Sequence, residues 1–272
     1  MARFKIGFLG AGNMAEALIL GLIKKMVFRP AEIGATTAHP ERLEVLRKRH
    51  GIEGVSSNLK LVEGSERLLL GVKPQQMRAV LEEVAPMVRR DHLILTIAAG
   101  LDTPFYYRFL PKETRLIRAM PNTPALLGEG AAGLFASGST TEPDREFALK
   151  LFSSVGTALF VPREEWLDIV TALSGSGPAF VYLFIHSMIE AASRLGLPSD
   201  IARTLMLKTL AGAGKMVETS ADPIADLIRR VASKGGTTEA GLAVLNEKGF
   251  ARTIEETIEA ATKRASELRR LA

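Results

Sequence analysis

Three glycines near the start of the chain, Gly7, Gly10 and Gly12, have a spacing that suits the binding of a pyrophosphate. Gly10 permits a tight turn after a short apolar run, and Gly12 has no side chain to keep a phosphate from the backbone. The free N–H groups and the dipole at the following helix start favour an anion. We therefore predict a dinucleotide site here, the alternative being a strand–helix turn without a ligand. The residues predicted to hold the pyrophosphate are Gly10, Ala11, Gly12, Asn13 and Met14.

The next chemical signal lies at the end of the second predicted strand. Residues 33–40 contain no acidic side chain, which would bind a ribose 2′-hydroxyl. Thr36 and Thr37 can instead hydrogen-bond a phosphate, and Arg42 lies one turn into the next helix. This pattern favours NADPH over NADH, although NADH stays possible. The alternative for Arg42 is an ordinary surface position on its helix.

Three further strand ends carry small, basic or amide-bearing residues that could surround the rest of a dinucleotide. Ligands of open α/β sheets bind at the carboxyl ends of the strands. Lys73 follows a buried apolar run, but on position alone it could equally be a solvated loop lysine. A rigid loop with two prolines follows another strand. The residues concerned are Val72, Lys73, Pro74, Ala98, Ala99, Met120, Pro121 and Asn122.

Two turns of small residues lie at helix starts in the second half of the chain. Residues 174–179 read Ser-Gly-Ser-Gly-Pro-Ala, and residues 233–238 read Ser-Lys-Gly-Gly-Thr-Thr. Backbone N–H groups and short hydroxyls at a helix start can hold a carboxylate. Plain helix capping is the alternative, but the double glycine before a double threonine exceeds what a cap needs. The predicted ligand residues are Ser176, Ser233, Gly235, Gly236, Thr237 and Thr238.

The elements that must position these residues change in kind at Pro162. Before it, short apolar runs alternate with helical patterns, as in a parallel sheet with helices on both faces. Residues 132–136 could add an antiparallel edge strand. Beyond Pro162 only helical patterns occur, with prolines near helix starts and glycines at helix ends. We predict a Rossmann-type, doubly wound parallel sheet in a domain of residues 1–162, followed by an all-helical domain of residues 163–272.

The predicted helix 178–195 is apolar on nearly every side. Such a helix must be buried, and the few helices of this domain can hardly cover it alone. We therefore predict a homodimer formed through the helical domain. As a membrane span, the apolar stretch 177–192 is interrupted by His186 and Glu190 and is too short.

The composition restricts the remaining function classes. The 272 residues include no cysteine, which excludes disulfides and thiolate nucleophiles and fits a reducing cytoplasm. The four histidines are scattered without metal-ligand spacing, so no metal is expected. The net charge of +5 contains no long basic run, so we expect solvated helix faces rather than nucleic-acid binding. No signal peptide is visible, and we expect a cytoplasmic protein without a membrane anchor.

Four motifs, in the order in which they occur, resemble the pyrroline-5-carboxylate reductase family. They are Val72-Lys73-Pro74-Gln75, the stretch 120–125, the stretch 172–179 and Gly235-Gly236-Thr237-Thr238, all after Gly-Ala-Gly-Asn-Met. The resemblance covers essentially the whole chain. It implies reduction of 1-pyrroline-5-carboxylate to L-proline by NADPH or NADH, the last step of proline biosynthesis. It also implies dimers or assemblies of dimers.

By this resemblance, the turn at 235–238 binds the substrate carboxylate and the Thr238 hydroxyl bonds the ring nitrogen. A protonated imine is already electrophilic, so no nucleophile or metal is needed. The family usually has Thr-Ser-Pro before the double glycine, where this chain has Ala232-Ser233-Lys234. Lys234 either raises substrate affinity or shifts the preference to a related cyclic imino acid.

Two rival functions use the same features. A β-hydroxyacid dehydrogenase needs a lysine acid in the helix after the Ser-Gly turn, but no lysine occurs between Lys150 and Lys208. A catalytically silent NADP-binding sensor would not need a carboxylate pocket. The turn at 235–238 therefore favours the reductase over both.

Overall fold

The computed structural model describes residues 3–271. They form two compact units, one of residues up to Ser176 together with the residues from Ala260 on, and one of Gly177–Glu259. These units differ in extent from the predicted domains 1–162 and 163–272. Val170 packs on the sheet, where a Cβ on Gly133 would lie 2.8 Å from it, and Asp168 pairs with Arg269 at 3.1 Å. Contacts of this kind keep residues 163–176 and the end of the chain with the sheet.

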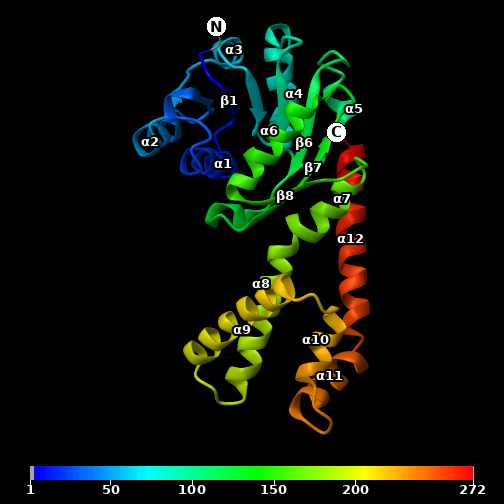
Figure 1. Ribbon diagram of the computed structural model, residues 1–272. Helices are drawn as coiled ribbons and strands as arrows, with labels where there is room; N and C mark the ends of the chain where they lie inside the picture. The colour runs from blue at the N-terminus through cyan, green and yellow to red at the C-terminus, as the bar shows by residue number, and fades with distance from the viewer. Residues whose placement is uncertain (1–2, 272) are drawn as a thin grey trace. The chain divides into compact units, whose positions relative to one another are not determined.

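The first unit contains an eight-stranded sheet with the strand order β3-β2-β1-β4-β5-β6-β7-β8 (Figure 1). All neighbouring strands are parallel except β6 and β7, which are antiparallel. The strands are β1 (Ile6–Leu9), β2 (Ile33–Thr36), β3 (Glu53–Gly54), β4 (Arg67–Leu70), β5 (Leu93–Thr96), β6 (Arg115–Met120), β7 (Gly130–Ala136) and β8 (Gly156–Phe160). This is the predicted doubly wound, largely parallel sheet.

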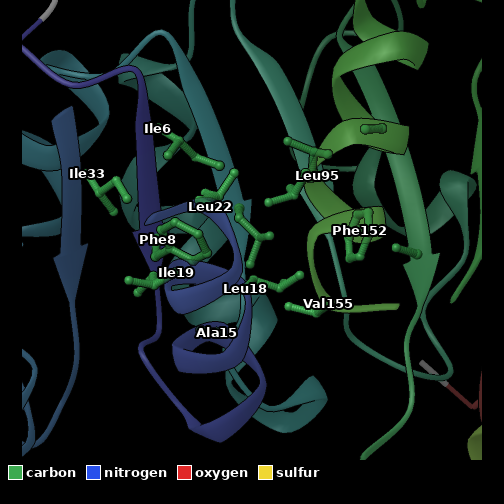
Figure 2. Close-up of a cluster of buried hydrophobic side chains, with 14 of the residues drawn as sticks. Ile6, Phe8, Ala15, Leu18, Ile19, Leu22, Ile33, Leu95, Phe152 and Val155 are labelled. Atoms are coloured by element: carbon green, nitrogen blue, oxygen red, sulfur yellow. The ribbon is translucent and has the colours of Figure 1, made fainter. Parts of the chain in front are cut away.

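Helices cover both faces of this sheet because its inner strands are apolar on both sides. On one face, Leu18, Ile19 and Leu22 of α1 pack against Ile6 and Phe8 of β1 (Figure 2). A second cluster fills the opposite face. The α-helices that lie entirely in this unit are α1 (Asn13–Lys24), α2 (Pro40–His50), α3 (Asn58–Glu63), α4 (Pro74–Val84), α5 (Thr103–Tyr106), α6 (Glu142–Phe152) and α7 (Trp166–Val170).

The seventh strand departs in part from the prediction. The stretch predicted at 132–136 is antiparallel to β6, as expected. The prediction of an edge strand is wrong, because β8 pairs with the other side of β7 in parallel. Gly156 makes this pairing possible, since a Cβ there would lie 2.0 Å from the carbonyl oxygen of Gly130.

The helix that begins in α7 does not end at the Ser-Gly turn. Thr171–Gly175 forms a π-helical segment, in which the Ser176 N–H donates to the Thr171 carbonyl at 2.8 Å. Together with α8 (Gly177–Arg194), the helical run Trp166–Arg194 is long and apolar enough to cross a membrane by length and composition alone. The prediction that the apolar stretch is too short is therefore wrong, since α7 and the π-helical segment extend it.

The second unit consists of α8, α9 (Ser199–Thr219), α10 (Ile224–Val231), α11 (Thr237–Glu247) and the first part of α12 (Phe250–Arg270), up to Glu259. Within residues 177–259, all of which the structure describes, Ala202 is the only buried residue. Large apolar side chains are exposed instead, including Tyr182 and Leu183 of α8 at 62% and 65%. A single copy of this unit therefore has no core of its own, and the apolar α8 is not buried within one chain.

Candidate functional site

The two glycines of the N-terminal turn have different physical reasons to be glycine. Gly10 has a φ of +93°, and a Cβ there would lie 2.7 Å from the backbone nitrogen of Val72. Gly12 is the N-cap of α1, and a Cβ there would meet no atom of the described chain within 4 Å. Gly10 is thus required by the fold, whereas Gly12 leaves open space at the free N–H groups of α1. This arrangement fits a pyrophosphate.

A cavity of about 780 Å³ opens beside this turn, at the carboxyl ends of the strands. It has the size typical of a site for a small molecule or cofactor. Its lining includes seven residues predicted from the sequence, together with Gly71, which directly precedes Val72. The seven are Gly10, Ala11, Gly12, Thr36, Thr37, Val72 and Lys73. The strand ends of β1, β2 and β4 therefore supply one continuous pocket, and its residues fit a dinucleotide.

The end of β2 holds an unpaired hydroxyl next to this cavity. Thr36 is 5% exposed, and its Oγ1 has no hydrogen-bond partner among the described residues. Thr37 is half-buried and lines both this cavity and a neighbouring one of about 470 Å³, which Arg42 also lines. Both threonines and Arg42 are thus placed where a ribose phosphate could reach them.

Arg42 is held by a carboxylate that the sequence interpretation missed. Its guanidinium forms an ion pair with Glu16 of α1, and Glu16 Oε1 lies 2.8 Å from His50 Nε2. Burial opposes ionisation of Glu16, but the hydrogen bonds to His50 and Arg42 outweigh it and hold the pKa of this carboxyl below its usual value. The sequence feature that could have indicated this contact is Glu16 itself, an acidic residue in the first turn of α1, the helix that follows the glycine turn.

The loop after β6 meets the π-helical segment within the first unit. A Cβ on Gly175 would lie 2.6 Å from Met120 Cε, so these residues are in close contact. Asn122 is 9% exposed; its Nδ2 donates to the Ser174 carbonyl at 3.0 Å, and its Oδ1 accepts from the Ala131 N–H at 2.8 Å. The Asn122 amide, predicted as a cofactor ligand, therefore bonds the protein itself. Pro121 beside it is buried.

The loop after β5 presents its two predicted residues differently. Ala98 is buried, whereas Ala99 is exposed. Gly100 follows with a φ of +73°, and a Cβ there would lie 3.4 Å from Leu268 Cβ. Ala99 is therefore the accessible small residue at this strand end.

The predicted substrate turn lies in the second unit, at the start of α11. Gly235 has a φ of +71°, and Gly236 is the N-cap of the helix. A Cβ on Gly236 would lie 2.5 Å from Ser233 Oγ, so the turn leaves no space for a side chain there. Gly235 is thus required by its backbone conformation, whereas a side chain at Gly236 would have to displace the Ser233 hydroxyl; Thr237 and Thr238 follow as the first helical residues. Ser176, predicted for the same ligand, belongs to the first unit.

One backbone donor of this turn is already engaged. The Gly235 N–H donates to Glu239 Oε2 at 2.6 Å. Glu239 is the third helical residue after the N-cap, a position from which an acid often reaches back to cap the turn. The sequence interpretation missed this contact, although the spacing from Gly236 to Glu239 could have indicated it. Any anion that binds the Gly235 N–H must share or replace this contact.

The comparisons with known proteins cover both units. A family model described as pyrroline-5-carboxylate reductase dimerisation matches residues 164–268, and one described as NADP oxidoreductase, coenzyme F420-dependent, matches residues 5–100. The pyrroline-5-carboxylate reductase of Pseudomonas aeruginosa is 40% identical over 268 residues, covering 98% of each chain. The chain belongs to the pyrroline-5-carboxylate reductase family.

Solved structures of this family agree with the fold. A pyrroline-5-carboxylate reductase from Coxiella burnetii matches with a TM-score of 0.92 and 32% identity, covering 98% of each chain. The Plasmodium falciparum pyrroline carboxylate reductase, solved with NADP bound, matches with a TM-score of 0.87 and 30% identity over 99% of each chain. The sheet followed by helices is thus the architecture of the family over its whole length.

Proposed function

We propose that the chain is an NAD(P)H-dependent reductase that converts 1-pyrroline-5-carboxylate to L-proline, the last step of proline biosynthesis. The observation that carries the proposal is the similarity to named pyrroline-5-carboxylate reductases over both units. A partial match would support nucleotide binding alone, because the nucleotide turn occurs on many unrelated enzymes. Here the similarity includes the turn at 235–238, which a mere nucleotide-binding protein would not need.

The cofactor is assigned to the first unit. In this proposal, residues 10–14 bind the pyrophosphate, and Thr36, Thr37 and Arg42 bind the 2′-phosphate of NADPH. Residues 72–74, Ala98 and Ala99 surround the ribose and nicotinamide, together with Met120 and Pro121. The open space at Gly12 and the unpaired Oγ1 of Thr36 support these assignments. Asn122 belongs to the same set of predicted residues, and its side-chain amide also fixes the loop beside Ser174.

The substrate carboxylate is assigned to the turn of Ser233, Gly235, Gly236 and Thr237, with Ser176 as a further donor. Backbone N–H groups at the start of α11 favour an anion, and exposed Lys234 adds positive charge to the same turn. Thr238 would donate its hydroxyl hydrogen to the lone pair of the neutral imine nitrogen and so make the C=N carbon more electrophilic. Bound NADPH supplies the hydride that reduces the C=N carbon. The protein contributes chiefly orientation, which supplies much of the rate when two reactants are held in place.

The exposed apolar helix supports self-association. We propose that a second copy covers α8, giving a homodimer or an assembly of dimers. The dimerisation match spans residues 164–268 and so includes this helix. That match favours a protein partner over lipid as the cover of the Trp166–Arg194 run. We further propose that the enzyme acts in the cytoplasm, without a nucleic-acid partner.

The substitution Thr238→Ala tests the catalytic assignment. Loss of one donor that acts in the transition state should lower kcat roughly 100-fold, while the affinity for NADPH stays within about twofold, because Thr238 touches only the substrate. Thr238→Ser keeps the hydroxyl and should retain most of the activity. An unchanged kcat in Thr238→Ala would remove Thr238 from the mechanism.

A substrate panel tests the reaction itself. NADPH should be oxidised in the presence of 1-pyrroline-5-carboxylate, whereas NADP⁺ should not be reduced in the presence of a β-hydroxyacid. A cyclic imino acid of different ring size belongs in the panel, because Lys234 stands where the family usually has proline. Faster turnover of that analogue would reassign the substrate within the same reaction class. Absence of turnover with every imine would support the silent NADP-binding alternative.

A further inference from the structure

Glu16 lies at the centre of a small charged cluster beside the nucleotide turn. Its two carboxylate oxygens bond the two ends of α2, Oε2 with Arg42 in the first turn and Oε1 with His50 in the last. The three side chains are 17%, 27% and 10% exposed for Glu16, Arg42 and His50. The cluster is thus shielded in part from solvent, where charges interact more strongly than on an open surface.

The guanidinium of Arg42 borders the nucleotide turn as well as Glu16. Its Nε lies 3.4 Å from the Ala11 carbonyl oxygen, and its Nη2 lies 3.5 Å from Asn13 Oδ1. Arg42 lines the smaller cavity, which shares Ala11, Gly12, Thr37 and His39 with the larger one. Glu16 lines neither cavity, so it reaches a ligand there through Arg42.

We propose that Glu16 sets the preference between NADPH and NADH, by competing with the 2′-phosphate for the Arg42 guanidinium. This inference rests on the proposed function, which places the 2′-phosphate at Thr36, Thr37 and Arg42. NADPH brings two negative charges to a cation that Glu16 already neutralises in part. NADH brings a hydroxyl to the same place and is indifferent to that charge. Glu16 therefore acts as a positioning and specificity residue that weakens NADPH more than NADH.

A purely structural role makes a different prediction. If Glu16 only ties α1 to α2, its loss lowers stability and weakens both nucleotides by the same factor. The ratio of the two dissociation constants separates these possibilities, because it cancels any effect common to both nucleotides.

The test measures NADP⁺ and NAD⁺ binding to the full chain by calorimetry, with no imine present. Glu16→Gln keeps a hydrogen-bond acceptor for Arg42 but removes the charge. The preference for NADP⁺ should rise roughly three- to tenfold at low salt, and less at high salt, as expected for removal of one nearby charge. A matched control is Glu66→Gln, which removes a carboxylate that pairs with Lys5 and Arg67 in the same unit, and it should leave the ratio unchanged.

A preference that stays the same or moves toward NAD⁺ in Glu16→Gln would overturn the inference. Two further variants test the route through Arg42. In an Arg42→Ala background, the effect of Glu16→Gln should shrink; an effect of the original size would contradict the proposed competition. His50→Leu removes the other hydrogen-bond partner of Glu16, so Glu16 should pair more strongly with Arg42. The nucleotide preference should then shift toward NAD⁺. A shift toward NADP⁺ would count against the inference. Because only binding is measured, this result is independent of whether the chain reduces 1-pyrroline-5-carboxylate.

Discussion

Gly10 and Gly12 stand two positions apart, yet only one of them is needed for folding. Gly10→Ala places a side chain at a φ of +93° and against the backbone of Val72, so it should lower the free energy of unfolding by about 1–3 kcal/mol. A Cβ at Gly12 meets no atom of the described chain within 4 Å, so Gly12→Val should leave stability nearly unchanged. It should nevertheless weaken NADPH binding at least about tenfold by blocking the pyrophosphate.

Chemical denaturation and nucleotide titration of both variants check this pair. Tight NADPH binding by Gly12→Val would show that the turn does not hold the pyrophosphate. A strongly destabilised Gly12→Val would instead contradict the open space described at this position.

His92 makes stability depend on pH in a defined direction. It is fully buried; its Nδ1 accepts from the Arg89 N–H at 3.1 Å, and its Nε2 donates to the Ser65 carbonyl at 3.1 Å. Burial and the nearby Arg89 charge lower the pKa of His92 from its ordinary value of 6.5. If Nδ1 carried a proton, it would face the Arg89 N–H, which is itself a hydrogen-bond donor. The native state thus disfavours the charged imidazole.

The sign of the effect follows from linkage. The unfolded chain takes up a proton near pH 6.5 and the folded chain only at lower pH, so this contribution is complete above 6.5 and is lost as the pH falls below it. Urea denaturation of the protein between about pH 7 and pH 5 should show falling stability, with a smaller fall in His92→Asn. His39→Asn, at an exposed position, is the control and should keep the full dependence. Equal pH dependence in all three proteins would contradict a neutral buried His92.

At the scale of elements, Asn122 joins the loop after β6 to the π-helical segment. Its amide satisfies the buried Ala131 N–H and the Ser174 carbonyl, so Asn122→Ala should lower the free energy of unfolding by roughly 2 kcal/mol. Thr123→Ala, at the exposed neighbouring position, should change it by less than about 0.5 kcal/mol. Thermal and urea denaturation check both. Equal stability of the two variants would show that the amide does not tie the elements together.

The sequence predicted the sheet well because its inner strands are continuous apolar runs that end in turns. It predicted the antiparallel stretch 132–136. It did not predict that this strand lies inside the sheet, because that depends on β8, which pairs with the other side of β7. The π-helical segment also escaped prediction. One extra residue per turn leaves no clear signal in the apolar pattern, and the glycines at 175 and 177 looked like a break between helices.

The sequence likewise predicted one part of the candidate site and not another. Residues of the glycine turn and of the strand ends β2 and β4 line one cavity, as the carboxyl-end argument anticipated. The partners of polar groups could not be foreseen, because they come from distant sequence. Asn122 bonds a carbonyl 52 residues later, and Arg42 meets an acid on another helix.

At the scale of the whole molecule, the two units differ in how they are stabilised. The first has a core on both faces of its sheet, while the second exposes most of its apolar side chains. Exposed apolar surface on this scale is a mark of association. The folded state of the helical unit should therefore depend on protein concentration.

The substitution Leu183→Glu tests this dependence. Leu183 is 65% exposed in one chain, and if a second copy covers α8 as proposed, a charge there should shift sedimentation velocity profiles toward the monomer. Leu127→Glu, at an 86% exposed leucine of the first unit, should sediment like the unchanged protein. An unaltered assembly of Leu183→Glu would place the self-association surface elsewhere.

The most direct measurement follows the hydride itself. NADPH carrying deuterium at the transferred C4 position is incubated with the protein and 1-pyrroline-5-carboxylate, and the product is analysed by mass spectrometry and NMR. We expect L-proline with one deuterium at C5, the ring carbon of the former C=N bond, formed in equal amount to the oxidised NADPH. NADPH loss without deuterated proline, or no turnover at all, would contradict it.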